Sequence, residues 1–198
     1  MGSFEIIMTP QQIQAALASF IRPSYPEMEI QVEAWTGDPS RLAIYFRETK
    51  FALLYPQQRW HYLHNLIPAE FQDRYLSNSV WYELAPGELP SDLMYADEAL
   101  VANITEPIMR ILNRTSFFAT LDEVFTSPEN PAVCWGDFRI AKSILATKGF
   151  FESEYFDVFS VLMAQGGYCD CEILYNVAED SEFARRYWAK RQSPPKQK

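Results

Sequence analysis

The spacing of apolar residues changes several times along the first half of the chain. Behind Thr9 and Pro10, which suit the cap and first position of a helix, apolar residues recur every three or four positions up to Ile21. The spacing then becomes two, returns to three or four after Pro56, and becomes two again near Ser79. In order, the pattern predicts a helix over 9–21, strands over 27–35 and 41–54, two helices over 56–75 separated at Pro68, and a strand over 78–88.

The second half of the chain is predicted to be mostly helical. Helix caps and helical spacing cover residues 91–126, and a stretch rich in proline follows over 126–136. Glycines then end the next two predicted helices, Gly149 the first and Gly166-Gly167 the second. The remaining predictions are helices over 138–148 and 155–165, a strand over 168–177 with alternating apolar residues, and a short helix over 181–191.

This element order predicts an α+β fold. Residues 9–90 form an N-terminal α-β-β-α-α-β layer with helices on one face of a three-stranded sheet. A helical connector over 91–127, a helix-helix-strand module over 134–180 and a basic tail over 181–198 follow. An isolated strand leaves its backbone N–H groups unpaired, so we expect the strand at 168–177 to join an edge of the N-terminal sheet and share its core.

Two short segments give residues 9–90 a family resemblance. The segments are "QRWHYLHNL" at the start of the helices after the second strand and "LAPGE" at the end of the third strand. They resemble the corresponding positions of BolA-like proteins, whose element order, shared with type II KH-like domains, is the one predicted here. The histidine that BolA-like proteins carry before the third strand is replaced by Ser79, Val80 and Trp81, so their iron-sulfur ligation does not carry over.

A second resemblance covers residues 134–177. The stretch "GGYCDCEILYNV" (166–177), with Cys134 upstream and two predicted helices between, resembles the signature of a family of short bacterial proteins of unknown function. The resemblance implies a bacterial protein with a recognisable domain. It implies no activity.

The cysteines of this stretch allow three interpretations. With a period of two, Cys169 and Cys171 lie on the apolar face of the predicted strand, opposite Asp170, so the first interpretation is that both are buried apolar side chains. The second is a metal site, and the third is a redox-sensing thiol. A Cys169–Cys171 disulfide is disfavoured because alternate residues of a strand lie about 6.5 Å apart at Cα with parallel side chains.

The metal interpretation requires further ligands. Cys134 would lie over the two strand cysteines and supply a third thiolate for Zn²⁺, and Asp137, His61 or His64 would supply a fourth ligand. His61 and His64 are three residues apart on a predicted helix, a spacing that also suits two aromatic side chains packed on one helix face.

Charge and composition limit the compartment and the partners. The net charge of −9 disfavours binding to nucleic acid, although no acidic residue follows Glu182 and the tail is basic. Three cysteines, an odd number, favour a reducing environment over a disulfide scaffold, and no apolar run approaches the length of a membrane span. We therefore expect a cytoplasmic protein without a membrane partner.

No assembled catalytic motif is visible in the sequence. There is no glycine-rich phosphate loop and no Gly-x-Ser-x-Gly turn. We therefore expect no enzyme and no cofactor but a protein-interaction or accessory/regulatory factor whose partner surface is aromatic: Trp81, Tyr82, Tyr187 and Trp188. The alternative is a zinc-binding protein or a thiol-dependent enzyme that uses Cys134, Cys169 and Cys171.

Overall fold

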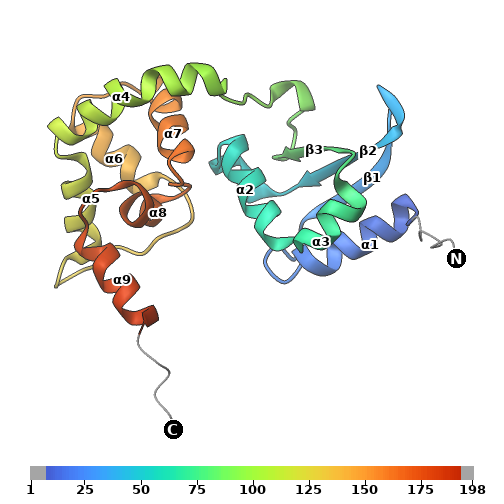
Figure 1. Cartoon of the computed structure of the whole chain (residues 1–198), viewed down its shortest axis with the longest axis horizontal. Helices are drawn as coiled ribbons and strands as arrows, with labels where there is room; N and C mark the ends of the chain where they lie inside the picture. The colour runs from blue at the N-terminus through green and yellow to red at the C-terminus, as the bar shows by residue number, and fades with distance from the viewer. Residues whose placement is uncertain (1–7, 193–198) are drawn as a thin grey trace, which may run out of the picture. The chain divides into compact units, whose positions relative to one another are not determined.

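The chain folds as two compact units, which we call unit 1 (residues 1–95) and unit 2 (residues 96–198). The computed structural model describes residues 8–192, and Figure 1 labels their helices and strands. The described strands all lie in unit 1, whereas the described part of unit 2 is helical. The predicted α+β class is therefore confirmed.

Unit 1 has the predicted order of helices and strands. Thr9 caps the first helix and Pro10 is its first residue, as the sequence indicates. The elements are α1 (Pro10–Ile21), β1 (Glu29–Trp35), β2 (Asp38–Arg47), η1 (Thr49–Leu53), α2 (Pro56–Leu66), α3 (Ala69–Phe71), η2 (Gln72–Leu76), β3 (Ser79–Leu84) and η3 (Pro90–Asp92). Of these, η2 is a π-helical turn that continues α3.

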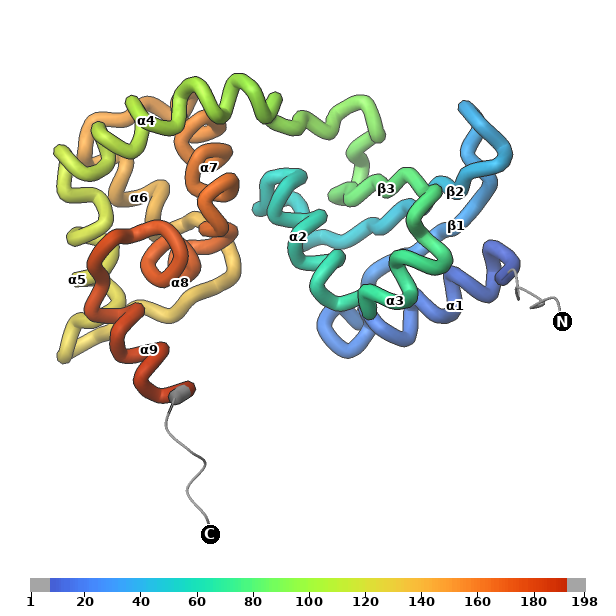
Figure 2. The backbone as a smooth tube through the Cα atoms, in the orientation of Figure 1, coloured from blue at the N-terminus to red at the C-terminus, as the bar shows by residue number. Residues whose placement is uncertain are grey.

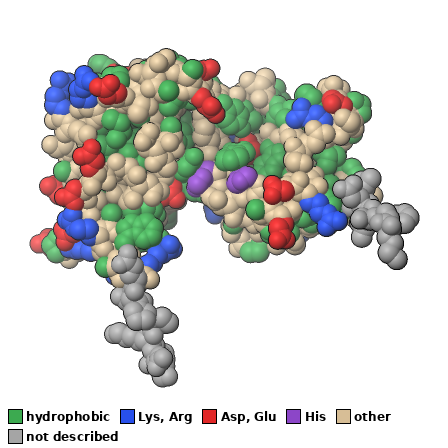
Figure 3. All heavy atoms as spheres, in the orientation of Figure 1, with side chains coloured by type: hydrophobic (Ala, Val, Ile, Leu, Met, Phe, Trp, Pro, Cys, Tyr) green, Lys and Arg blue, Asp and Glu red, His purple; other side chains and the backbone are tan. Residues whose placement is uncertain are grey.

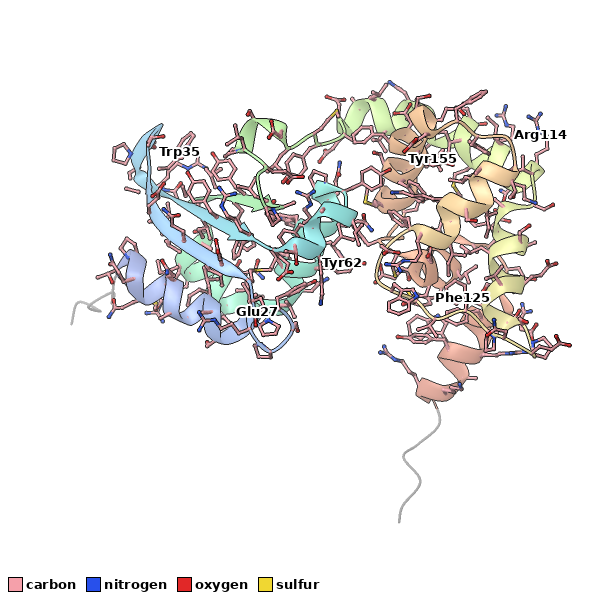
Figure 4. The ribbon with its side chains drawn as sticks, turned by 180° about the vertical axis from the view of Figure 1, so that it is seen from behind. Glu27, Trp35, Tyr62, Arg114, Phe125 and Tyr155 are labelled. Atoms are coloured by element: carbon pink, nitrogen blue, oxygen red, sulfur yellow. The ribbon has the colours of Figure 1, made fainter. Side chains whose placement is uncertain are left out.

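The sheet of unit 1 has β2 in its centre. The first two strands form the predicted antiparallel hairpin, with Trp35 at the end of β1 (Figure 4), and β3 runs parallel to β2. Val32, Ile44 and Trp81 are aligned across the three strands, so they share one face. Helices α1 to α3 cover this face (Figure 1), and Val32, Ile44 and Phe46 form the centre of the core.

Unit 2 packs its helices around a core of phenylalanines. Phe117, Phe138 and Phe159 are almost completely buried, and the rings of Phe138 and Phe159 stack at 4.2 Å. The elements are α4 (Glu98–Arg114), α5 (Phe117–Thr126), α6 (Arg139–Thr147), η4 (Glu152–Glu154), α7 (Tyr155–Ala164), α8 (Asp170–Glu172), η5 (Ile173–Val177) and α9 (Glu182–Gln192). The predicted helices at 138–148, 155–165 and 181–191 are confirmed as α6, α7 and α9.

Helix α9 begins at a cap that comes from a distant part of the chain. The carboxylate of Asp122, on α5, accepts hydrogen bonds from the backbone N–H groups of Glu182 (2.9 Å) and Phe183 (3.0 Å). Phe183 also packs against Phe125 of α5, with ring centroids 5.1 Å apart (Figure 4). Together these contacts fix the start of α9 against α5.

The predicted strand at 168–177 is wrong. The chain is extended at Cys169 and then forms the helical turn α8 and the π-helical turn η5, which Figure 2 traces as a tight coil before α9. The apolar residues Ile173, Leu174 and Val177 are buried, and their spacing suits a helix as well as a strand.

Without a strand at 168–177, this segment adds nothing to the sheet. In the described chain the sheet contains only β1, β2 and β3, so the expectation of one core shared by both sequence halves is also wrong. Between residues 8 and 192, no helix has the length and apolar character needed to cross a membrane.

Candidate metal centre

Two glycines shape the entry to the cysteine segment. Gly166 has φ +88°, in the left-handed region that favours glycine, and the N–H of Gly167 donates to the carbonyl of Leu162 (2.9 Å), which ends α7. At Gly167 a Cβ atom would lie 2.9 Å from Val177 Cγ2 and 3.2 Å from the Cα of Ile173. The first glycine therefore provides the turn, and the second allows η5 to pack closely against it.

Asp170 connects the cysteine segment to the start of α6. Its side chain is fully buried, and its two oxygens accept hydrogen bonds from the N–H groups of Ile140 (3.0 Å) and Ala141 (2.9 Å). The Asp170 N–H donates to the carbonyl of Asp137 (3.0 Å). Asp170 thus caps a helix outside its own segment. The prediction that it lies on the face of a strand opposite the two thiols is wrong, because no strand forms here.

The same hydrogen bonds place three cysteines together. Cys134 lies on the loop between α5 and α6, which continues into Asp137, while Cys169 and Cys171 flank Asp170. The Sγ atoms of Cys169 and Cys171 are 3.3 Å apart, and all three Sγ atoms lie within 4.8 Å of one another. Cys169 is buried, whereas Cys134 and Cys171 are half-buried.

The pKa values of the three thiols depend on the hydrogen bonds among them. The pKa of Cys134 is lowered because the thiols of Cys169 and Cys171 donate hydrogen bonds to its sulfur, although burial opposes the shift. The pKa values of the other two thiols are raised by these hydrogen bonds to Cys134, that of Cys171 to about 11. The cluster therefore holds one negative charge easily, and a cation would favour the loss of further protons.

Two nearby groups border the cluster. The hydroxyl of Tyr175, on η5, lies 3.4 Å from the Sγ atom of Cys171, and burial raises the pKa of this phenol. Burial also raises the pKa of Asp170 to about 7, although the N–H groups of Ala141 and Ile140 favour its charged form.

The fourth ligands expected from the sequence belong to different units: Asp137 lies in unit 2 with the sulfurs, whereas His61 and His64 lie in unit 1. In the described part of the chain, the metal-ligating side chains that come together are these three cysteines. Asp137 is buried, and both of its oxygens accept hydrogen bonds from Arg139. His61 and His64 lie on α2 of unit 1, and Figure 3 shows the histidine side chains in purple. The ring of His64 stacks on Trp60, with ring centroids 4.4 Å apart.

The predicted partner aromatics are divided between the two units. On β3, the half-buried Trp81 packs against Phe46 in the core, and Tyr82 stacks on Tyr45 on the opposite sheet face, with centroids 5.1 Å apart. On α9, Tyr187 stacks on Tyr175 at 4.7 Å, and Trp188 meets the same ring edge-on. The α9 pair therefore lies next to the thiol cluster.

Sequence reasoning missed one group in unit 1. Glu83 is fully buried on the helix-covered face of β3. The available signal was the alternation in this strand, which places an acidic residue two positions after Trp81 on the inward face.

Among the comparisons with known proteins, the match to a protein family lies in unit 2. No curated protein and no solved structure matches the chain. None of the comparisons supports the resemblance of residues 9–90 to BolA-like and type II KH-like proteins, which stays a prediction. Residues 118–176, which include all three cysteines, match a family described as "Protein of unknown function (DUF2695)", and this match confirms the predicted resemblance of the C-terminal part to a family of unknown function.

Proposed function

We propose that this protein is a non-catalytic accessory factor that binds Zn²⁺ through Cys134, Cys169 and Cys171. The observation that supports the proposal is the meeting of three sulfur atoms within 4.8 Å. Around a tetrahedral zinc ion with bonds of about 2.3 Å, two sulfur ligands lie about 3.8 Å apart. Small side-chain rotations of the three cysteines would reach that spacing.

The backbone around the cysteines is fixed independently of the sulfurs. Asp170 caps α6, and the glycine pair positions the segment against η5, so the two chain segments that carry the thiols are already joined. A metal would then need to rearrange only side chains. The buried thiol of Cys169 and the half-buried thiol of Cys171 are 3.3 Å apart, close to the spacing that two thiolate ligands of one zinc ion need.

Three protein ligands leave one tetrahedral position for a further ligand. Val133 and Trp135, on either side of Cys134, are both 67% exposed. A zinc ion bound by Cys134 would hold these side chains in place at the surface, and a partner protein could provide the fourth ligand. A fourth ligand from a partner protein would close the coordination sphere, as in structural zinc sites, and would suit an accessory role.

The zinc content of the protein tests the proposal. Protein purified without chelator is expected to contain about one zinc per chain by elemental analysis, and chelation is expected to lower the melting temperature by about 5 °C or more. Replacing all three cysteines by serine should abolish both effects. Circular dichroism before and after chelation would show whether unit 2 keeps its helices.

The histidines provide the matched control. In the His61→Asn and His64→Asn variants the zinc content should stay at one per chain, because the three cysteines are proposed to hold the metal without them. Less than about one tenth of a zinc per chain in the unmodified reduced protein, after incubation with excess Zn²⁺ and removal of free metal, would contradict the proposal.

Protein binding through the Cys134 loop is the second candidate function, favoured by the exposure of Val133 and Trp135. Trp135→Ala should reduce the binding of a partner whose cross-links map to residues 133–135, whereas Trp188→Ala, on α9, should leave it unchanged. Equal loss in both variants, or cross-links that map elsewhere, would argue against this loop as the contact.

A further inference from the structure

Unit 1 contains a pocket that is separate from the thiol cluster. Its volume is about 490 Å³, and it lies among α2, η2, β3 and the segment that leaves β3. The side chains that bear on its chemistry are Arg41, Trp60, His64, Trp81, Glu83 and Tyr95.

One oxygen of a buried carboxyl group in this pocket has no partner. Glu83 is 0% exposed, and its Oε2 accepts a hydrogen bond from the Tyr95 hydroxyl (2.8 Å), but its Oε1 makes no hydrogen bond within residues 8–192. A buried polar atom without a partner is costly, and native proteins rarely keep one without a use. The orphan oxygen can accept a hydrogen bond, so a ligand that donates one would satisfy it.

The nearest arginine is already occupied by other acceptors. Arg59, which is buried, donates to the Glu83 backbone carbonyl (2.8 Å) and the Leu54 carbonyl (3.0 Å), and it forms a two-pronged ion pair with Glu88 (2.5 and 3.0 Å). It gives no hydrogen bond to the carboxyl group of Glu83. Burial raises the pKa of that carboxyl group, in line with the weak compensation of its charge.

Aromatic side chains form part of the pocket lining. Trp60, Trp81 and Tyr95 line it, and the ring of His64 stacks on Trp60. Aromatic faces attract cations. Arg41 is the pocket's arginine, and it precedes Leu42, which pairs with Ser79. Glu83 pairs with Phe46, so Arg41 lies five strand positions away, roughly 16 Å along β2.

The π-helical turn η2 forms another wall. Gln72, Asp73 and Leu76 of this turn line the pocket, and single π-helical turns occur frequently at functional sites. We propose that this pocket binds a small organic cation, an amine or guanidine with a compact apolar body, whose N–H donates to Oε1 of Glu83 while its body lies against Trp60 and Trp81.

Benzylammonium and benzyl alcohol distinguish charge recognition from simple filling of the pocket. The two probes have the same ring and differ in the charged group. With the full chain, saturation-transfer NMR and calorimetric titration should show millimolar or tighter binding of benzylammonium and at least about tenfold weaker binding of the alcohol. Equal affinities, or no measurable binding of the amine, would overturn the proposal.

Two variants locate the probe. Glu83→Gln keeps the side-chain shape and should weaken benzylammonium binding by about tenfold or more, whereas Glu70→Gln, the same change at an exposed position on α3, should have no effect. Trp60→Ala changes a side chain that is 42% exposed, so it tests the aromatic wall without a risk to the core. The affinity of the Trp60→Ala variant for benzylammonium should fall at least about threefold. Unchanged affinity in Glu83→Gln or in Trp60→Ala would place the probe elsewhere and reject the site.

Discussion

Both units bury a carboxyl group completely, but they treat it differently. In unit 2, each oxygen of Asp170 accepts a backbone N–H at the start of α6, so the group joins two segments of the chain. In unit 1, Glu83 has one oxygen bonded to Tyr95 and one without a partner. The difference separates a structural carboxyl group, whose hydrogen bonds are internal, from one that remains available to a ligand.

Removal of the Asp170 carboxyl group should give the larger effect. Asp170→Ala leaves the N–H groups of Ile140 and Ala141 buried without an acceptor and removes the link between α6 and the cysteine segment. We expect unit 2 to lose about 3 kcal/mol of unfolding free energy. Urea unfolding followed by hydrogen exchange, with peptides assigned to each unit, would measure it.

The Asp157→Ala variant is the control for Asp170, because Asp157 is an exposed aspartate on α7. Its unfolding free energy should change by less than about 0.5 kcal/mol. If Asp170→Ala were equally mild, or if unit 1 lost the stability instead, Asp170 would not be the structural link described above.

Removal of the Glu83 charge should have a smaller effect of opposite sign. Because the pKa of Glu83 is raised in the folded state, this group favours folding at pH values below its usual pKa, and that contribution is lost as pH rises through the folded pKa. Glu83→Gln should therefore make unit 1 more stable than the unmodified protein by about 1 kcal/mol at pH 8.

The pH dependence of this difference is the sharper measurement. The advantage of Glu83→Gln should shrink as the pH falls toward 4, where the unmodified side chain is also neutral. Urea unfolding of both proteins at several pH values would measure it. A difference that does not vary with pH would show that Glu83 is compensated by groups other than Tyr95.

Local signals explain the parts of the fold that the sequence predicted. Thr9 and Pro10 define the start of α1 within four residues, and the alternation in β1 and β2 needs no distant information. The segment at 168–177 differs, because its apolar residues suit both periods. Whether this segment forms a strand or helical turns depends on Asp170 and on the hydrogen bond that its carboxylate accepts from the N–H of Ile140, 30 positions earlier in the chain.

The two candidate sites were predictable to different degrees. The grouping of Cys134, Cys169 and Cys171 was predicted as the metal alternative, although from a strand geometry that the structure does not have. The importance of Glu83 depends on which partners its two oxygens find, and that follows from the position of Tyr95 outside the sheet. No spacing in the sequence contains this information.

The caps of α6 and α9 have a consequence for the order in which unit 2 folds. Asp170 lies 30 residues from Ile140 in the first turn of α6, and Asp122 lies 60 residues from Glu182 at the start of α9. A cap from a neighbouring residue can form while a helix nucleates, whereas these caps require a long loop to close first, with its entropy cost. Both helix starts should therefore become stable only late in folding, after α5 and the 166–177 segment have found their positions, which gives unit 2 a slower and more cooperative folding step than its helix content suggests.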